Sequence, residues 1–315
     1  MNFMKSDNGF GTVRQRTLKN PIPCRGVALH SGGECAMTVR PAGPDHGIVF
    51  KRTDVTDRDC LVPARWDRVS STTLCTTISN QDGVEVATIE HFMAALAGCG
   101  IDNALIEIDG PEVPIMDGSS APFVMLFECA GSVEQQVPRR ALRVLKPVSV
   151  SDGECGVTAL PAPDFSVDFE IDFASPAISE RSLDIRLVNG TFNETISRAR
   201  TFGFMKDIDR LRAAGFALGG SLDNAVVVDG DRVLNEGGLR FDDEFVRHKI
   251  LDCVGDLYLA GGPMLARVVA HKSGHGFNNK LLRALFADES AWEWTTLDES
   301  EVAGWHEEAP LAATA

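Results

Sequence analysis

Two histidines lie close to carboxylate residues in the sequence, at spacings that would let their side chains act together in one site. The first is His91, which directly follows Glu90 near the start of ATIEHFMAALAG (87–98), a stretch with helical periodicity. Neighbours on a helix point about 100° apart, so one side chain can bind a ligand while the other flanks it. A metal ligand next to a carboxylate base needs this geometry. The alternative is an acid at a helix N-terminus beside a half-buried histidine, and the pair alone leaves both open.

The second histidine, His248, is followed by Asp252 and Asp256 at intervals of four residues. This spacing puts all three on one face of a helix predicted over 243–260. The other faces are apolar, which predicts burial, and buried ionisable groups are costly unless they are paired or bind a metal. A histidine and an aspartate one turn apart can chelate one Zn²⁺; a buried His–Asp ion pair is the alternative. Lys249, next to His248, favours a functional site.

A third segment, HKSGHG (271–276), connects a predicted strand to a predicted helix. The glycines on both sides of His275 let the backbone approach a ligand closely. Lys272 and the N-terminus of the following helix would favour an anion. The alternative is an ordinary polar connection, since such turns often carry glycine and polar residues.

Together the three segments predict a catalytic metal site with three protein ligands from distant parts of the chain. Three ligands leave a fourth position for water, as in catalytic rather than structural zinc sites. Glu90 is the candidate general base, and His275, oriented by Asp256, is the candidate acid. The chain has no H-E-x-x-H motif, so a thermolysin-like protease is not indicated. The predicted ligands are His91, His248 and Asp252.

The hydrophobic pattern predicts the elements that must position these residues. A helix–strand–helix order occurs twice, over 87–130 and over 243–287. Helices packed on mainly antiparallel sheets would make the fold class α+β, with two similar layers. The individual helices are predicted over 87–97, 119–130, 206–214, 243–260 and 278–287.

The length of 315 residues suggests two domains of about 150 residues each. Residues 133–140 have the composition of a linker, so we predict one α+β domain over 1–138 and a second over 139–287. Residues 288–315 hold eight acids and no Lys or Arg. We expect this acidic tail to be partly disordered.

The charge balance excludes two kinds of polyanionic partner. With 30 Lys+Arg against 45 Asp+Glu, the net charge is −15, so the chain lacks the basic surface that binds nucleic acid or anionic membranes. Residues 246–283, however, carry six Lys or Arg against two Asp, a net of +4. The segment with most of the predicted site could therefore bind one small anion such as a diphosphate.

Other features of the sequence point to the cytoplasm. No run of about 18 apolar residues predicts a membrane helix, and the N-terminus lacks the apolar stretch of a signal peptide. The eight cysteines form no C-x-x-C pair. We expect them to be free thiols in a reducing compartment.

Seven segments, in order along the chain, resemble one family closely: UDP-3-O-acyl-N-acetylglucosamine deacetylase, the zinc amidase of lipid A biosynthesis. The resemblance runs from near the N-terminus to about residue 287. The matching strings are RTLKNPIPCRGVALHSG (16–32), TLCTTI (73–78), TIEHFMAALAGCGIDNALIEIDGPEVPIMDGSSAPFV (88–124), SRARTFGF (197–204), LGGSLDNAVVVD (218–229), LNEGGLRFDDEFVRHKILDCVGDLYLAG (234–261) and HKSGHGFNNKLL (271–282).

The resemblance implies a catalytic role for each residue of the predicted site. The ligands named above would bind Zn²⁺, although Fe²⁺ accepts the same ligands. Glu90 would take a proton from water that attacks the acetamide, and His275, held protonated by Asp256, would protonate the leaving amine. Thr201 would hydrogen-bond the oxyanion, and Lys249 would support developing negative charge.

The resemblance also implies how the substrate, an acylated UDP-amino-sugar, would bind. Phe202 would contact the sugar, Lys272 and Arg143 would lie near the UDP phosphates, and His30 would lie at the mouth of the site. Leu74 and Cys75 would lie near the entry of the acyl chain. An insert near 204–236 would line the passage for that chain; its apolar pattern alone favours ordinary core. The apolar residues expected along the passage are Phe204, Met205, Ile208, Leu211, Phe216, Leu218 and Val226.

The family's fold would be two domains, each a β-sheet layer with helices and a small insert, and with the helices sandwiched between the domains. His271 departs from the family pattern, because a tyrosine is expected there. We expect a monomer with one activity. Two alternatives remain open: a zinc deacetylase for another N-acetyl sugar, and a catalytically silent protein that binds a nucleotide sugar or a metal.

Overall fold

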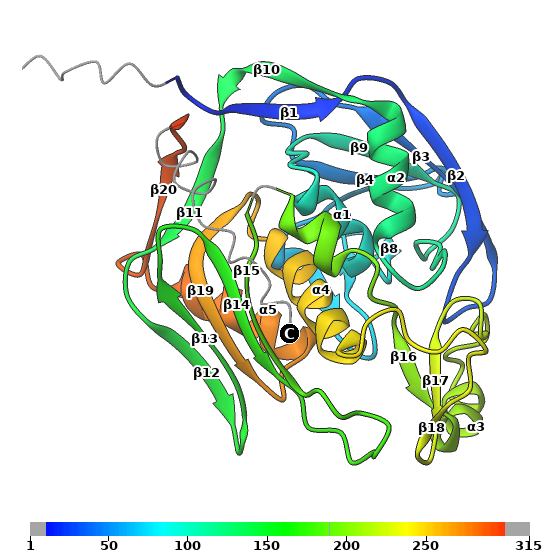
Figure 1. Cartoon of the computed structure of the whole chain (residues 1–315). Coiled ribbons are helices and arrows are strands. Elements are labelled where there is room, and N and C mark those ends of the chain that lie inside the picture. The colour runs from blue at the N-terminus through cyan, green and yellow to red at the C-terminus, as the bar shows by residue number, and fades with distance from the viewer. Residues whose placement is uncertain (1–10, 189, 300–315) are drawn as a thin grey trace, which may run out of the picture.

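The computed structural model describes residues 11–188 and 190–299. Its strands form two main sheets, each packed against helices (Figure 1). Helices α1 (Glu90–Gly98) and α4 (Glu244–Tyr258) lie between the two sheets and contact each other along their length. The predicted α+β class, with helices sandwiched between sheet layers, is confirmed.

The first main sheet has five strands in the order β2-β3-β9-β4-β5. Alternate residues along its strands are buried, such as Met37 and Val39 of β3, so one face packs on the helices. Its strands are β2 (Ile22–Val27), β3 (Glu34–Pro41), β4 (Ile48–Arg52), β5 (Leu61–Pro63) and β9 (Ala104–Ile108). The remaining elements of this half are β1 (Arg14–Leu18) paired with β10 (Ser132–Pro138), a 3₁₀ turn (Trp66–Arg68), and a small sheet of β6 (Val69–Ser71), β7 (Thr77–Ser79) and β8 (Glu85–Val86).

Phe92 shows how α1 is held in the core of the first half. Its ring lies 5.8 Å from that of Phe50 in β4, and 5.3 and 5.6 Å from those of Phe123 and Phe127 in α2 (Ala121–Ala130). Every residue of α1 from Glu90 to Leu96 is buried, polar ones included. The helix is therefore covered on all sides, and the polar groups at its start must find partners inside the protein.

The second main sheet has the order β12-β13-β19-β11-β20, and β14 pairs with both β19 and β15. Helix α5 (His275–Ala287) follows β19 and packs on β12 and β13. It begins at His275, earlier than the predicted start at 278. The strands are β11 (Arg140–Val144), β12 (Val148–Asp152), β13 (Cys155–Pro161), β14 (Phe165–Glu170), β15 (Ser182–Arg186), β19 (Met264–His271) and β20 (Trp292–Thr296).

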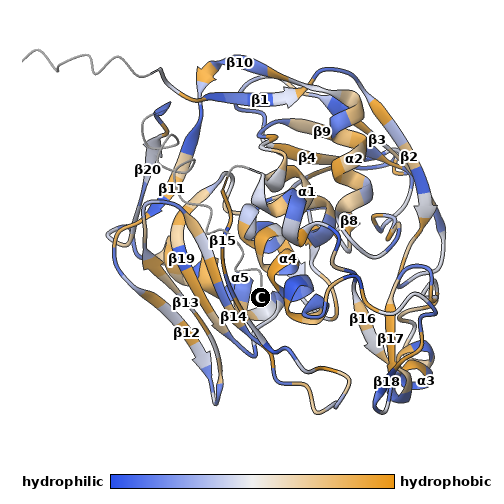
Figure 2. Cartoon of the chain, in the orientation of Figure 1, coloured by the Kyte–Doolittle hydropathy of each residue, from blue (hydrophilic) through white to orange (hydrophobic). Residues whose placement is uncertain are grey.

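A small unit projects from the second half, where the acyl-chain insert was expected (Figure 1). Its strands are β16 (Phe202–Phe204), β17 (Val226–Asp229) and β18 (Arg232–Val233), with α3 (Met205–Ala213) beside them; a short π-helical turn (Phe192–Ile196) precedes the unit. β17 is largely hydrophobic, and α3 is mixed (Figure 2). Two glycines let this unit approach the first half closely: a Cβ at Gly118 would lie 2.1 Å from the Asn224 carbonyl oxygen, and one at Gly219 would lie 2.2 Å from that of Ala28.

Two segments that the sequence predicted to lack regular structure form strands that pair with distant parts of the chain. Residues 133–140, read as a linker, lie mostly in β10, which pairs antiparallel with β1. Residues 292–296, placed in the acidic tail, form β20 and pair antiparallel with β11. Each pairing partner is distant in sequence, so local composition could not indicate it. The rest of the expected tail from residue 300 lies outside the described residues.

Gly255 brings helices α1 and α4 into direct backbone contact. A Cβ at this position would lie 2.0 Å from the carbonyl oxygen of Glu90 and 3.0 Å from the backbone nitrogen of Ala94. Only glycine allows this approach, because such a contact is shorter than any real Cβ makes. The crossing places the first turn of α1, with His91, against the polar face of α4. None of the helices in the described residues is long and apolar enough to cross a membrane.

Gly255→Ala should therefore force the two helices apart. We expect it to lower the free energy of unfolding by about 1–3 kcal/mol, the usual cost of overpacking a core, and to lower activity as well. Urea unfolding and thermal melts measure the effect. Gly237→Ala is the matched control, because nothing lies within 4 Å of a Cβ at that exposed glycine. A Gly255→Ala protein as stable and active as the wild type would contradict this role for the crossing.

Candidate active site

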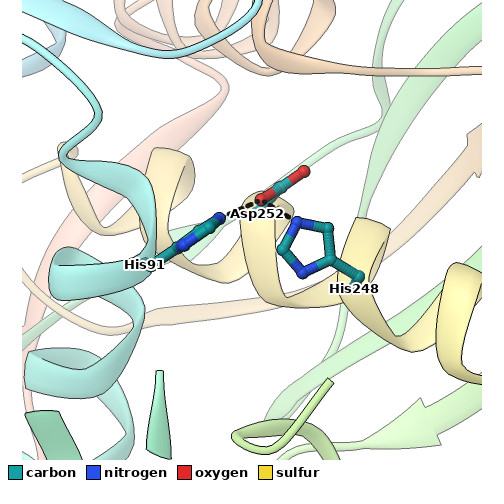
Figure 3. Close-up of side chains that lie close together, drawn as sticks. All are labelled: His91, His248 and Asp252. Atoms are coloured by element: carbon teal, nitrogen blue, oxygen red, sulfur yellow. Dashed lines mark ion pairs between the residues drawn. The ribbon is translucent and has the colours of Figure 1, made fainter. Parts of the chain in front are cut away.

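Three buried side chains converge between the helices (Figure 3). His91 comes from α1, and His248 and Asp252 come from α4. The Nε2 atoms of the two histidines lie 3.5 and 3.4 Å from Asp252 Oδ1, and the three ligand atoms lie within 4.8 Å of one another. The sequence-based prediction that these residues form one cluster is confirmed.

The surroundings of the cluster suit a metal ion. His248 Nδ1 lies 3.1 Å from the Ala199 carbonyl oxygen, so it carries the proton and leaves the Nε2 lone pair free to coordinate. Burial lowers the pKa of His248 to about 4, which keeps the ring neutral at physiological pH. Asp252 Oδ1 is buried and accepts no hydrogen bond from any described residue. Two histidine nitrogens and one such carboxylate oxygen match the donor set of zinc and of ferrous iron.

Lys249 holds the other oxygen of the same carboxylate. Its Nζ lies 2.7 Å from Asp252 Oδ2, and both side chains are largely buried. Burial would raise the pKa of Asp252, but the ammonium group of Lys249 outweighs it and holds that pKa well below its usual range. Burial likewise opposes the charge of Lys249, yet Asp252 raises the pKa of the amine above its usual value. Asp252 is therefore ionised, with Oδ1 left to face the histidines.

Glu90 and His275 lie next to each other beside the cluster. The Glu90 side chain is 3% exposed, and this burial raises the pKa of its carboxyl group. Glu90 Oε2 accepts a hydrogen bond from the backbone N–H of Thr76, and Glu90 Oε1 lies 3.9 Å from His275 Nε2. His275 Nδ1 lies 2.8 Å from Asp256 Oδ2. Burial would lower the pKa of His275, but Asp256 and Glu90 raise it to about 9. A protonated histidine thus faces a carboxyl group with an elevated pKa, the pairing of an acid and a base.

The three clustered side chains, together with Glu90, Lys249 and His275, line a cavity of about 330 Å³ that shares part of its wall with a second cavity. The second cavity, about 380 Å³, is mainly apolar and runs between α3, β17 and the segment at Leu29 and His30. Each cavity alone lies at the lower end of the range for small-molecule sites. Residues common to both walls are Leu29, Leu74, Thr201, Phe202, Gly203 and Leu211.

Comparison with known proteins agrees with this arrangement. Residues 15–287 match the model of the UDP-3-O-acyl N-acetylglycosamine deacetylase family. The chain is a member of that family. It is 51% identical to the UDP-3-O-acyl-N-acetylglucosamine deacetylase of Vibrio parahaemolyticus over 289 residues, which cover 91% of this chain and 94% of the relative. The enzymes of the same name from Idiomarina loihiensis and Histophilus somni are 51% and 50% identical over 291 residues, each covering 92% of this chain and 95% of the relative.

Most of the substrate-side residues expected of a deacetylase of this family lie on the cavity walls. Phe204 lines the first cavity, and Thr201, Phe202 and Leu74 line both. His30 lines the second cavity, and its ring packs edge-on against Phe216 at 5.4 Å. Of the residues expected along the acyl passage, Met205, Ile208 and Leu211 line the apolar cavity.

The remaining expected residues lie elsewhere in the deacetylase. The Cys75 thiol is 5% exposed, and burial raises its pKa to about 12, so it is unreactive. Lys272 Nζ lies 2.8 Å from both Glu154 and Asp172, away from the cavity walls. Arg143 lies on β11 and borders a different hollow, with the prolines around Ala162. His271, the departure from the family pattern, lies 3.0 Å from Glu170.

Sequence reasoning missed several residues that build the site. Phe173 lines the first cavity and packs edge-on against Phe202 at 5.3 Å, but its segment carries no motif. Asn278 donates a hydrogen bond to Asp256 Oδ2 at 2.8 Å, and Thr76 donates one to Asp256 Oδ1 at 2.6 Å. Both belong to strings that resemble the family, HKSGHGFNNKLL and TLCTTI. That resemblance was the available signal, because neither residue is a metal ligand or a titratable group.

Proposed function

We propose that this protein hydrolyses the N-acetyl group of UDP-3-O-acyl-N-acetylglucosamine, releasing acetate and UDP-3-O-acyl-glucosamine in the committed step of lipid A biosynthesis. The observation that carries the proposal is the junction of two cavities: the ligand cluster with its acid and base lines one, and the other is apolar. A polar reaction site that opens into an apolar passage suits an acylated sugar. The names of the relatives support the same substrate.

Zn²⁺ is the metal that we propose for His91, His248 and Asp252, with Fe²⁺ as the alternative. When bound, the metal would supply Lewis-acid activation of water and of the amide carbonyl. The neutral His248 ring and the ionised Asp252 carboxylate suit this role because neither needs to lose a proton on binding.

The protein's own groups would move the protons. Glu90 would take a proton from the attacking water, since its raised pKa brings it towards the operating pH. His275, held through Nδ1 by Asp256, would give the proton on Nε2 to the leaving nitrogen. Lys249 and Thr201 line the same cavity, where they would stabilise negative charge that develops on the carbonyl oxygen.

The substrate would lie across both cavities. Phe202 and Phe204, which line the first, would contact the sugar and the start of the chain, and the acyl tail would run past His30 and α3. Lys272 would contact the UDP phosphates after exchanging its two carboxylate partners for them. We further propose a monomer in the cytoplasm; all eight cysteines are free thiols, as a reducing compartment requires.

The dependence of kcat on pH should be bell-shaped. Glu90 must be ionised to act as a base, so activity falls as the pH drops through its raised pKa. His275 must be protonated, so activity also falls as the pH rises through about 9. Asp256→Asn removes the charge that raises the pKa of His275 and should move the alkaline limb down by roughly one to three pH units. Measurement of kcat against pH checks both; a flat profile between about pH 5 and 9 would argue against the pair.

The proposed function is tested by assaying acetate release from UDP-3-O-acyl-N-acetylglucosamine over a series of acyl lengths. We expect release that a chelator abolishes and added Zn²⁺ restores, and slower release from UDP-N-acetylglucosamine, which lacks the acyl chain. Equal rates on the two would argue for another N-acetyl sugar. Binding without release of acetate would indicate a silent binding protein and overturn the proposal.

A further inference from the structure

Thr76 makes contacts with both halves of the proton-transfer machinery. It directly precedes β7 and is 1% exposed. Its backbone N–H donates to Glu90 Oε2 at 3.0 Å, and its carbonyl accepts from the N–H of Ile89 at 3.4 Å. Its hydroxyl reaches α4 and donates to Asp256 Oδ1 at 2.6 Å. One residue therefore links the start of α1 to the carboxylate that holds His275.

The hydrogen bond from the Thr76 hydroxyl fixes which oxygen of Asp256 accepts from which donor. Oδ1 accepts from Thr76, while Oδ2 accepts from Asn278 and lies 2.8 Å from His275 Nδ1. Asp256 is 3% exposed, so no bulk water would replace a lost donor. Without the hydroxyl, the carboxylate could rotate about its last torsion, and the imidazole would lose its fixed orientation.

The backbone bond acts on Glu90 in the same way. Because Oε2 is occupied by the N–H of Thr76, Oε1 is the oxygen that faces His275 Nε2, 3.9 Å away. The same residue thus orients both the proposed base and, through Asp256, the proposed acid. The rate of the chemical step depends steeply on such alignment, and a misplacement of about 1 Å can lower that rate about a hundredfold.

We propose that Thr76 is a positioning residue that aligns Glu90 with the Asp256–His275 pair through its backbone N–H and its hydroxyl. The proposal deepens the proposed function and rests on it for the roles of Glu90 and His275. A merely structural hydroxyl would satisfy a buried carboxylate and affect folding alone. A positioning hydroxyl should affect the chemical step and leave substrate binding and metal content as they are.

Thr76→Val tests this, because valine keeps the shape and the backbone N–H and removes only the hydroxyl. We expect kcat to fall about ten- to hundredfold, with KM and metal content close to those of the wild type. Thr76→Ser restores the hydroxyl and should recover most of kcat. Thr77→Val is the matched control: that threonine is also buried, and its hydroxyl lies 3.8 Å from the Cys75 sulfur. It should behave as the wild type does.

A second readout does not depend on activity. In protein labelled with ¹⁵N-histidine, the Nδ1–H resonance of His275, assigned with His275→Gln, should shift or broaden in Thr76→Val and stay in place in Thr77→Val. An unchanged resonance in Thr76→Val, unchanged kcat, or a Thr76→Ser protein as impaired as Thr76→Val would overturn the proposal. If the wild type releases no acetate but the resonance responds, the proposed function fails and the placement of Thr76 stands.

Discussion

Glu90→Gln should lower kcat by about two or more orders of magnitude while the protein keeps its metal. Removal of a general base typically costs 10²–10⁴-fold, because the amide cannot take the proton of the attacking water. Glutamine is nearly isosteric, and its amide oxygen can still accept the bond that the Thr76 N–H donates to Glu90. The fold and the ligand cluster should therefore survive. The measurement is kcat together with metal content per chain.

Two comparisons make the Glu90 result specific. Glu34→Gln changes an exposed glutamate at the start of β3 and should leave kcat as it is. Glu90→Ala removes the hydrogen-bond acceptor as well and should be at least as slow as Glu90→Gln. Wild-type activity in Glu90→Gln, with metal bound, would disprove the assignment of the base.

Asp252→Ala should lose the metal, and with it most of the activity. The carboxylate is the only acidic member of the cluster, and the two remaining proposed ligands are histidines in a buried site. Lewis-acid activation is worth several kcal/mol, and each 1.36 kcal/mol is a factor of ten, so the rate should fall about two or more orders of magnitude. Lys249 also loses its partner, which for a buried ion pair costs about 3–5 kcal/mol of stability. Metal analysis, kcat and a thermal melt measure the three effects.

The loss of metal must be separated from loss of the fold. Treatment of the wild type with a chelator should reproduce the loss of activity without removing the partner of Lys249, and added Zn²⁺ should reverse it. Asp209→Ala, at an exposed aspartate in α3, is the matched substitution and should keep both metal and activity. An Asp252→Ala protein with full metal content would remove this residue from the ligand set.

The polar face of α4 could be predicted from the sequence, because the side of a helix on which a residue lies depends only on local geometry. A helix repeats every 3.6 residues, so the spacing of His248, Asp252 and Asp256 places them on one side wherever the helix lies. The adjacency of Glu90 and His91 is local in the same sense. These positions, and the helices that carry them, are confirmed within a few residues at their ends.

Long-range pairing limited the rest of the sequence-based prediction. β10 and β20 were read as linker and tail because their composition is polar or acidic, yet each is an edge partner of a strand far away in the chain. The start of α5 was placed too late for a local reason: glycine and polar residues suggested a loop where the helix begins at His275.

The sequence by itself determined which chemical groups are available: three side chains of the types that bind metals, the carboxylate that we propose as the base, and the histidine that we propose as the acid, with its aspartate. Tertiary structure decided that they meet. A glycine at position 255 lets the backbones of α1 and α4 touch, and this crossing carries His91 to the face of His248 and Asp252. The Thr76 hydroxyl reaches Asp256 across 180 residues, and the apolar cavity forms where α3 and β17 meet the segment at His30. Such contacts depend on how whole layers pack, and neither spacing nor composition along the chain encodes that packing locally.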